Sequence, residues 1–73
     1  MRKYSRYLLE KLYKSRKGEL TLEEFEEIYF QEYQRSLTNK EKLRLVAEIK
    51  YSEEIGVKYK AGELGIKTIY FLK

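Results

Sequence analysis

Any acid–base or metal chemistry in this chain would have to come from glutamate, lysine or tyrosine. The 73 residues include no His, Cys, Asp, Pro or Trp, so the commonest general base and the thiolate nucleophile are missing. Glutamates are adjacent at Glu23/Glu24, Glu26/Glu27 and Glu53/Glu54, where a pair could act in catalysis or bind a hard cation. Neighbouring side chains on a helix point about 100° apart, however. We therefore expect no catalysis, no metal site and no cofactor.

Basic side chains are the other chemically active groups, because they bind phosphate and other anions. The formal net charge is only +4, but the charges are unevenly distributed. Residues 1–17 carry seven basic side chains and one acidic one, residues 18–33 carry six glutamates and no base, and residues 34–50 are basic again. This alternation indicates separate basic and acidic surfaces.

The composition predicts one small domain that spans residues 1–73. Hydrophobic residues make up 42% of the chain and aromatic residues 15%, which is too much apolar surface for a disordered protein. The absence of Cys is typical of a reducing compartment. Neither a long apolar run nor an apolar segment behind the basic N-terminus is present. We therefore expect a cytoplasmic protein without a membrane span or a secretory signal.

Three segments have the hydrophobic spacing of amphipathic helices. The predicted helices cover residues 4–16, 22–34 and 39–51. Gly18 ends the first helix, and the capping-box pairs Thr21/Glu24 and Thr38/Glu41 begin the second and third. The apolar side of these helices, with one hairpin residue, gives the expected core: Tyr7, Leu8, Leu12, Leu22, Phe25, Ile28, Tyr29, Tyr33, Leu43, Leu45, Val46, Ile49 and Tyr70.

After the third helix, the spacing of the apolar residues changes from helical to alternating. Residues 57–61 alternate apolar and basic side chains, and residues 61–65 form a turn bracketed by Gly62 and Gly65. Residues 66–72 are rich in β-branched and aromatic side chains. We therefore predict a β-hairpin over residues 57–72 and an α+β fold.

The order helix, short extended piece, helix, tight turn, helix, β-hairpin resembles the winged helix-turn-helix domain. This domain is common among small transcription factors of bacteria, archaea and their viruses. The resemblance covers nearly the whole chain and depends on the element order, on residues 18–22 (Gly-Glu-Leu-Thr-Leu) and on residues 55–57 (Ile-Gly-Val). It implies three helices with a C-terminal hairpin wing. It also implies binding of double-stranded DNA, with the third helix in the major groove and the wing along the backbone or minor groove.

The third helix carries side chains that suit this role. Lys40, Arg44, Ala47 and Tyr51 share the arc opposite to its apolar stripe. The two basic side chains can reach phosphates or guanine edges, and Arg44 is the best candidate for a bidentate guanine contact. Ala47 permits close approach, and Tyr51 can touch a phosphate or a thymine methyl. Glu48 flanks this surface and counts against it, unless it is turned away or reads a cytosine amino group.

Other basic residues would contact the DNA backbone. Lys58 and Lys60 project from one side of the hairpin and Lys67 stands on the partner strand, so the wing can present a basic edge to phosphate. Lysines at a strand edge also protect a protein from aggregation, which is an equally good explanation for them. Arg2 and Lys3 would add nonspecific backbone contacts.

Two functions remain open because a charged helix face occurs on any globular protein. The first is a transcriptional regulator that binds double-stranded DNA as a homodimer, since symmetric pairing doubles the few base contacts of one module. Exposed aromatic residues of the first helix, such as Tyr13, would serve the pairing. The alternative is a protein-interaction module without DNA binding, which the acidic second helix favours because Glu23 and Glu24 would sit awkwardly near phosphate. Nothing indicates RNA binding or a small-molecule substrate.

Overall fold

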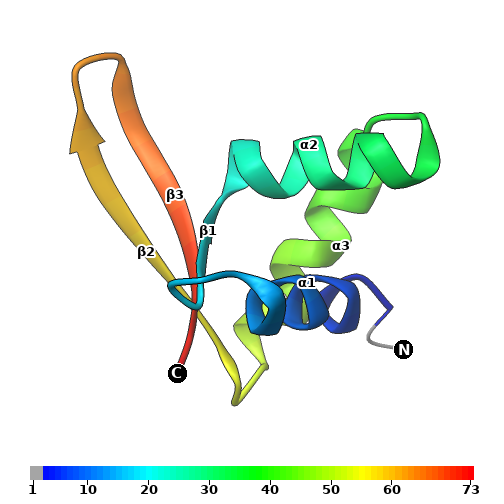
Figure 1. Cartoon of the computed structure of the whole chain (residues 1–73), viewed down its shortest axis with the longest axis horizontal. Helices are drawn as coiled ribbons and strands as arrows, with labels where there is room; N and C mark the ends of the chain where they lie inside the picture. Colours follow the sequence, from blue (N-terminus) through cyan, green and yellow to red (C-terminus); the bar gives the residue numbers. More distant parts are fainter. Residues whose placement is uncertain (1–2) are drawn as a thin grey trace.

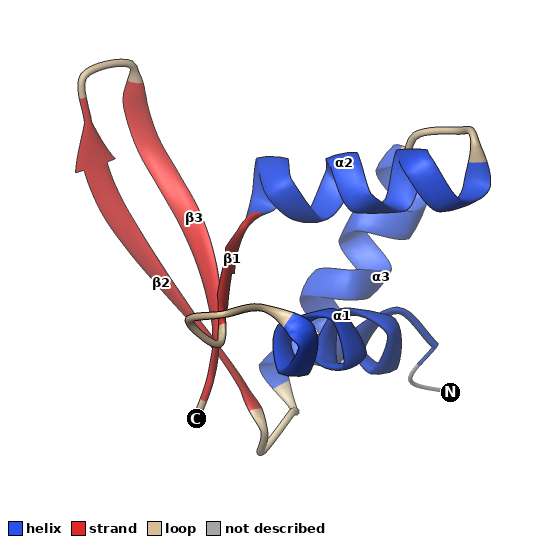
Figure 2. Cartoon of the chain, viewed as in Figure 1, coloured by secondary structure: helices blue, strands red, loops and turns tan. Residues whose placement is uncertain are grey.

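The computed structural model describes residues 3–73. In this range the chain forms three helices and a three-stranded antiparallel sheet, so the expected α+β class is confirmed (Figures 1 and 2). The elements are, in order, α1 (Lys3–Lys14), β1 (Glu19–Thr21), α2 (Leu22–Tyr33), α3 (Asn39–Lys50), β2 (Ile55–Gly62) and β3 (Gly65–Leu72). None of these helices combines the length and the apolar character that a membrane crossing requires.

Both predicted capping boxes form and set the first residues of α2 and α3. The Thr21 hydroxyl accepts a hydrogen bond of 3.1 Å from the Glu24 amide, and the Glu24 carboxylate accepts one of 2.9 Å from the Thr21 amide. Thr38 and Glu41 repeat this arrangement with the same two distances. Each box satisfies amides that the start of a helix leaves without partners, so these starts were predictable from local sequence.

The helix ends differ slightly from the prediction. α1 ends at Lys14, before the turn through Gly18, whose φ is 65°. α2 ends at Tyr33 because Gln34 adopts the left-handed conformation with φ 56°, while its amide still donates to the Phe30 carbonyl at 2.8 Å. α3 ends at Lys50, and the hairpin begins at Ile55, earlier than expected.

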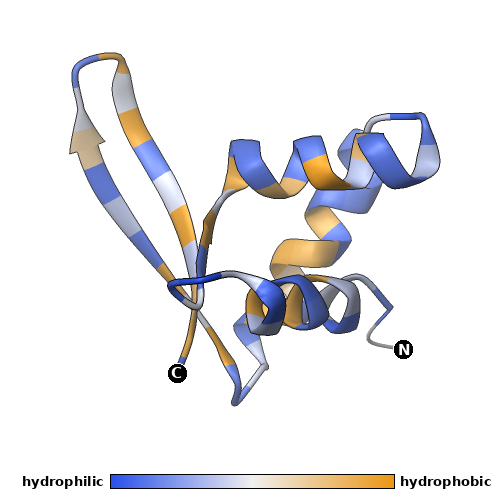
Figure 3. Cartoon of the chain, in the orientation of Figure 1, coloured by the Kyte–Doolittle hydropathy of each residue, from blue (hydrophilic) through white to orange (hydrophobic). Residues whose placement is uncertain are grey.

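The sheet contains one pairing that the sequence did not predict. β1 was expected only as a short extended piece, but it pairs with β3 so that Glu19 lies opposite Phe71 and Thr21 opposite Ile69. The strand order is β1-β3-β2, and β2 is therefore an edge strand. Beyond the short β1, the hairpin continues as a two-stranded extension, residues 59–68, which we call the arm. The arm projects away from the helices (Figures 1 and 3).

The core lies between the three helices and one face of the sheet. The Phe25 ring of α2 is 1% exposed and lies at its centre, with its centroid 5.7 Å from that of Tyr7 in α1 and 6.3 Å from that of Tyr70 in β3. The buried hydrophobic side chains in the described chain are Leu8, Leu12, Leu20, Phe25, Tyr29, Leu37, Leu45, Ile49, Ile55 and Tyr70. All three helices and all three strands therefore contribute to one core.

Most of the expected core is confirmed, but three of its residues were predicted wrongly. Tyr7, Leu22 and Ile28 are partly buried at the edge of the core. Tyr33, Leu43 and Val46 are exposed, by 51%, 70% and 60%. The errors at Leu43 and Val46 have one cause. The helix is rotated relative to the prediction, so that Glu48 instead of these two residues lies on the inward arc.

Candidate nucleic-acid interface

The exposed side of α3 is the surface that the sequence predicted to contact DNA. Leu45 and Ile49 are buried and fix the rotation of the helix. The opposite arc is exposed, and its middle line runs through Leu43 and Ala47. We call this arc, together with the residue that caps it, the α3 face; it comprises Asn39, Lys40, Leu43, Arg44, Val46, Ala47, Lys50 and Tyr51.

Glu48 is turned away from the α3 face. Its side chain is only 8% exposed, and its Oε1 accepts a hydrogen bond of 2.8 Å from the backbone amide of Ser5. Ser5 lies in the first turn of α1, where free amides and the helix dipole favour a negative charge. The other carboxylate oxygen lies 3.6 Å from Arg44 Nε. Glu48 thus joins α1 to α3 and leaves the α3 face without its charge exposed.

Glu41, the second glutamate of α3, is also held on the inner side. Its two carboxylate oxygens accept hydrogen bonds from the Arg35 guanidinium at 2.8 and 3.0 Å. The Tyr4 hydroxyl donates a third at 2.8 Å, and the Thr38 amide donates a fourth. The Arg35 guanidinium holds the pKa of Glu41 far below its usual range, and the bonds from the Thr38 amide and the Tyr4 hydroxyl add to this effect. The bond between Tyr4 and Glu41 also raises the pKa of Tyr4. Glu41 therefore stays ionised with its charge compensated locally.

The N-terminal end of α1 brings one more predicted cation to the α3 face. Lys3, Lys40 and Arg44, together with Tyr4 and Glu41, line a shallow pocket of about 250 Å³ between α1 and α3. Lys3 and Lys40 are exposed and form no ion pair within the described chain, while the Arg44 side chain is 58% exposed. Three of the predicted DNA-binding residues are therefore neighbours. Arg2 lies outside the described residues.

Arg44 was predicted to lie on the outward arc near the middle of the helix. It lies at the border of the exposed arc toward α1, where its Nε is 3.6 Å from a Glu48 carboxylate oxygen. Ala47 and Tyr51 are exposed, as predicted. The Tyr51 ring is 70% exposed, and the Lys50 ammonium lies 5.9 Å from its centroid.

The wing lysines lie on a separate surface. Lys60 and Lys67 stand opposite each other in the β2–β3 ladder, and Lys58 precedes Lys60 by two residues, so all three share one sheet face. That face points away from the helices, because Ile55 and Tyr70 on the other face are buried in the core. The structure therefore does not join the wing lysines to the α3 face.

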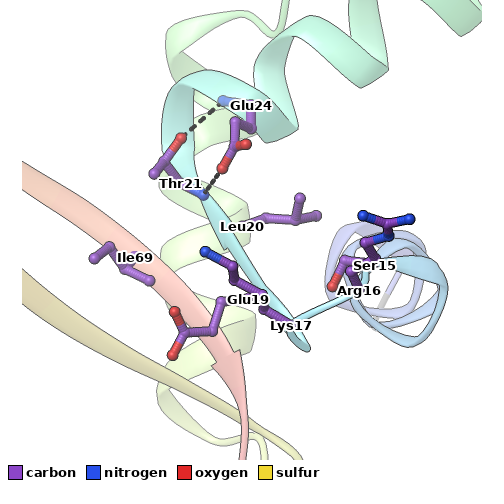
Figure 4. A pocket seen from close by; sticks show the side chains of 8 residues that line it. All are labelled: Ser15, Arg16, Lys17, Glu19, Leu20, Thr21, Glu24 and Ile69. Atoms are coloured by element: carbon purple, nitrogen blue, oxygen red, sulfur yellow. Dashed lines mark hydrogen bonds between the residues drawn. The ribbon is translucent and has the colours of Figure 1, made fainter.

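One of the wing lysines is already paired within the protein. Lys58 donates a hydrogen bond of 2.7 Å to Glu19 and lowers the pKa of that carboxyl, with smaller contributions from Lys17 and Lys60. Beside Glu19, the loop between α1 and β1 adds Arg16 and Lys17, which line a pocket of about 360 Å³ (Figure 4). The outer sheet face and the adjoining loop thus form a second basic surface. It contains Glu19, which is paired with Lys58, and borders Glu24, whose carboxylate belongs to the capping box of α2.

The sequence pattern left four residues of the α3 face unpredicted. Asn39 and Lys50 were left out although they are exposed, and Leu43 and Val46 were placed in the core because they are apolar. No local signal in the sequence distinguishes them from core residues, since their spacing fits an inward stripe. Comparison with protein-family models, with curated proteins and with solved structures gives no match to this chain.

Proposed function

We propose that this chain is a winged-helix protein that binds double-stranded DNA as a homodimer and regulates transcription without catalysing a reaction. One observation carries the proposal: the α3 face combines Lys40, Arg44 and Lys50 with apolar side chains, while both glutamates of α3 point inward. A protein surface for DNA must supply positive charge and keep carboxylates away from phosphate. The α3 face meets both requirements.

The dimensions and the order of the elements support this function. A helix with its side chains is about 10–12 Å across, and the major groove of DNA is about 12 Å wide, so α3 can enter it with its exposed arc toward the bases. The succession α1-β1-α2-α3-β2-β3 with sheet order β1-β3-β2 fits the winged-helix resemblance. In the complex, the arm reaches beyond the body of the protein toward the backbone or minor groove.

Each basic residue has a role in this proposal that follows from its position. Arg44 is released from its long contact with Glu48 and donates to a guanine edge, whereas Lys40 and Lys3 at the start of their helices bind phosphate. Lys60 and Lys67 contact phosphates along the arm. Lys58, which is paired with Glu19, contributes least.

The experiment measures affinity for duplex DNA by fluorescence anisotropy at several salt concentrations. Sites selected from a random library serve as specific targets and a scrambled duplex as the nonspecific one. Lys40→Ala and Lys60→Ala should weaken both kinds of binding and flatten the salt slope by roughly one unit each. Arg44→Ala should instead reduce the affinity for the selected site far more than for the scrambled duplex.

Lys14→Ala is the matched control, because Lys14 is an exposed lysine at the far end of α1 that pairs only with Glu10 of its own helix in the described chain. It should leave DNA affinity and the salt slope nearly unchanged. Salt-insensitive binding that is equal for the wild type and all four variants would refute the proposal.

The alternative is a protein-interaction module that does not bind DNA. One specific observation favours it: Glu23, Glu24 and Glu27 are exposed on α2, beside the half-exposed ring of Phe30. Such an acidic and aromatic surface suits a basic protein partner. The same salt titration separates the two functions, since an interaction module has no steep dependence on salt when it is mixed with random DNA.

A further inference from the structure

The α3 face leaves aliphatic side chains exposed to water. Leu43 is 70% exposed and Val46 60%, and the exposed Ala47 completes a set with helical spacing of three and four residues. Single exposed apolar residues are normal on protein surfaces. Three neighbours on the one helix proposed to enter the groove form a continuous apolar strip, which points to an apolar ligand group.

The surrounding charges decide which ligand carries that group. Lys40, Arg44 and Lys50 flank the strip, and both glutamates of α3 are held inward by hydrogen bonds. The ligand is therefore polyanionic at its borders and apolar between them. The DNA major groove has this pattern where the thymine C5-methyl projects between two phosphate backbones, and the methyl is the only apolar group that the base edges present there. RNA lacks this methyl, and its major groove is too narrow for side chains to read.

We infer that the α3 face recognises thymine methyl groups, so that the specific DNA sites of this protein carry thymines where Leu43, Val46 and Ala47 meet the groove. This inference rests on the proposed function and adds the base that is read. Leu43 and Ala47 are separated by about 6 Å along the helix axis. Successive base pairs are separated by about 3.4 Å. The strip therefore spans about two base-pair steps and contacts the methyls of two thymines.

Replacing thymine by deoxyuridine tests the inference without altering the protein. This substitution removes the methyl and keeps the hydrogen-bonding edge of the base. A site selected from a random duplex library is synthesised with thymine and with deoxyuridine, and anisotropy gives the Kd for each. From the burial of one carbon per methyl, we expect Kd to rise about fourfold for one contacted methyl and about fifteenfold for two.

Variants then assign the effect to the strip. Leu43→Ala with Val46→Ala should reduce the difference between the two duplexes to less than about twofold. Leu64→Ala is the matched control, because Leu64 is a fully exposed aliphatic residue at the turn of the arm. It should keep the full difference. Circular dichroism checks that each variant is folded. If a variant does not fold, the Kd values of the wild type for the thymine and deoxyuridine duplexes still test the inference.

The possible failures are distinguishable. Tight, salt-dependent binding with equal Kd for thymine and deoxyuridine duplexes would overturn the methyl inference and leave the DNA-binding function intact. An absence of DNA binding by the wild type would overturn both. A dimer that dissociates when Leu43 and Val46 are replaced, combined with equal binding of the two duplexes, would show that the strip is an interface between two copies of the chain.

Discussion

Replacement of Phe25 by alanine tests the proposed organisation of the core. Phe25 is 1% exposed and its ring contacts both Tyr7 of α1 and Tyr70 of β3. A buried Phe→Ala change costs about 3–5 kcal/mol, because it removes the transfer free energy of the ring and leaves a cavity. At roughly 0.05–0.15 kcal/mol per residue, a chain of this length has a free energy of unfolding of only about 4–11 kcal/mol. The variant should therefore lose a large part of its stability.

Val46→Ala is the comparison that makes this prediction specific. The side chain of Val46 is 60% exposed, so the removal of two carbons, worth about 0.8 kcal/mol each when buried, costs only about 0.6 kcal/mol here. Alanine recovers a few tenths of this through its higher helix propensity. The net change should be close to zero, although both residues belong to apolar stripes in the sequence.

Thermal denaturation followed by circular dichroism measures both changes. For a domain of this size, about 1 kcal/mol corresponds to roughly 4–8 °C in Tm, so Phe25→Ala should melt more than about 10 °C below the wild type. Val46→Ala should melt within about 3 °C of it. Equal shifts for the two variants, or a larger one for Val46→Ala, would show that the assignment of inner and outer faces in α3 is wrong.

Three further predictions concern the sheet, the ion pairs and self-association. A Cβ on Gly56 would lie 2.3 Å from the Phe71 ring, so Gly56→Ala should cost about 1–3 kcal/mol in urea denaturation, and less when Phe71 is also replaced by alanine. Because Arg35 lowers the pKa of Glu41 in the folded state, the ionised carboxylate stabilises the fold fully above the ordinary carboxyl range, and this stabilisation is lost progressively as the pH falls below that range toward the lowered pKa. Glu41→Gln should accordingly destabilise the protein at pH 7 and flatten its acid-induced loss of stability below about pH 5, and parallel pH profiles would contradict this. Sedimentation should detect a dimer that Tyr13→Ala weakens, since the ring is 66% exposed on α1, and a monomer both free and on DNA would remove the homodimer from the proposal.

The local parts of the fold were predictable from the sequence. The Thr21/Glu24 and Thr38/Glu41 boxes act within four consecutive residues, so the pattern alone determined where α2 and α3 begin. The pairing of β1 with β3 places Glu19 opposite Phe71, and these residues are separated by most of the chain. β1 has only three residues, which is too short for an alternating pattern that would predict a strand.

The candidate site was predicted less completely for a similar reason. Beside the buried Leu45 and Ile49, the inward side of α3 includes Glu48, which accepts a bond from the Ser5 amide, a group that is far away in sequence. Hydrophobic spacing assigns glutamate to the solvent and valine to the core, and here the helix N-terminus of α1 reverses that preference. Arg44 and Lys40 were predicted because they lie within the outward arc in either rotation, whereas Leu43 and Val46 lie there only in the rotation that the structure shows.

The paired lysines of the arm give its two strands an unusual dependence on ionic strength. Lys60 and Lys67 face each other directly in the ladder, and like charges in that relation repel and weaken strand pairing. Added salt screens this repulsion, so amides of the arm should exchange with solvent more slowly as salt rises. Ion pairs elsewhere in the molecule, such as that of Lys11 with Glu32 between α1 and α2, respond in the opposite sense. A polyanion bound between Lys60 and Lys67 would offset their repulsion as salt does, but only at this pair of residues. It would therefore make the arm more rigid than in the free protein.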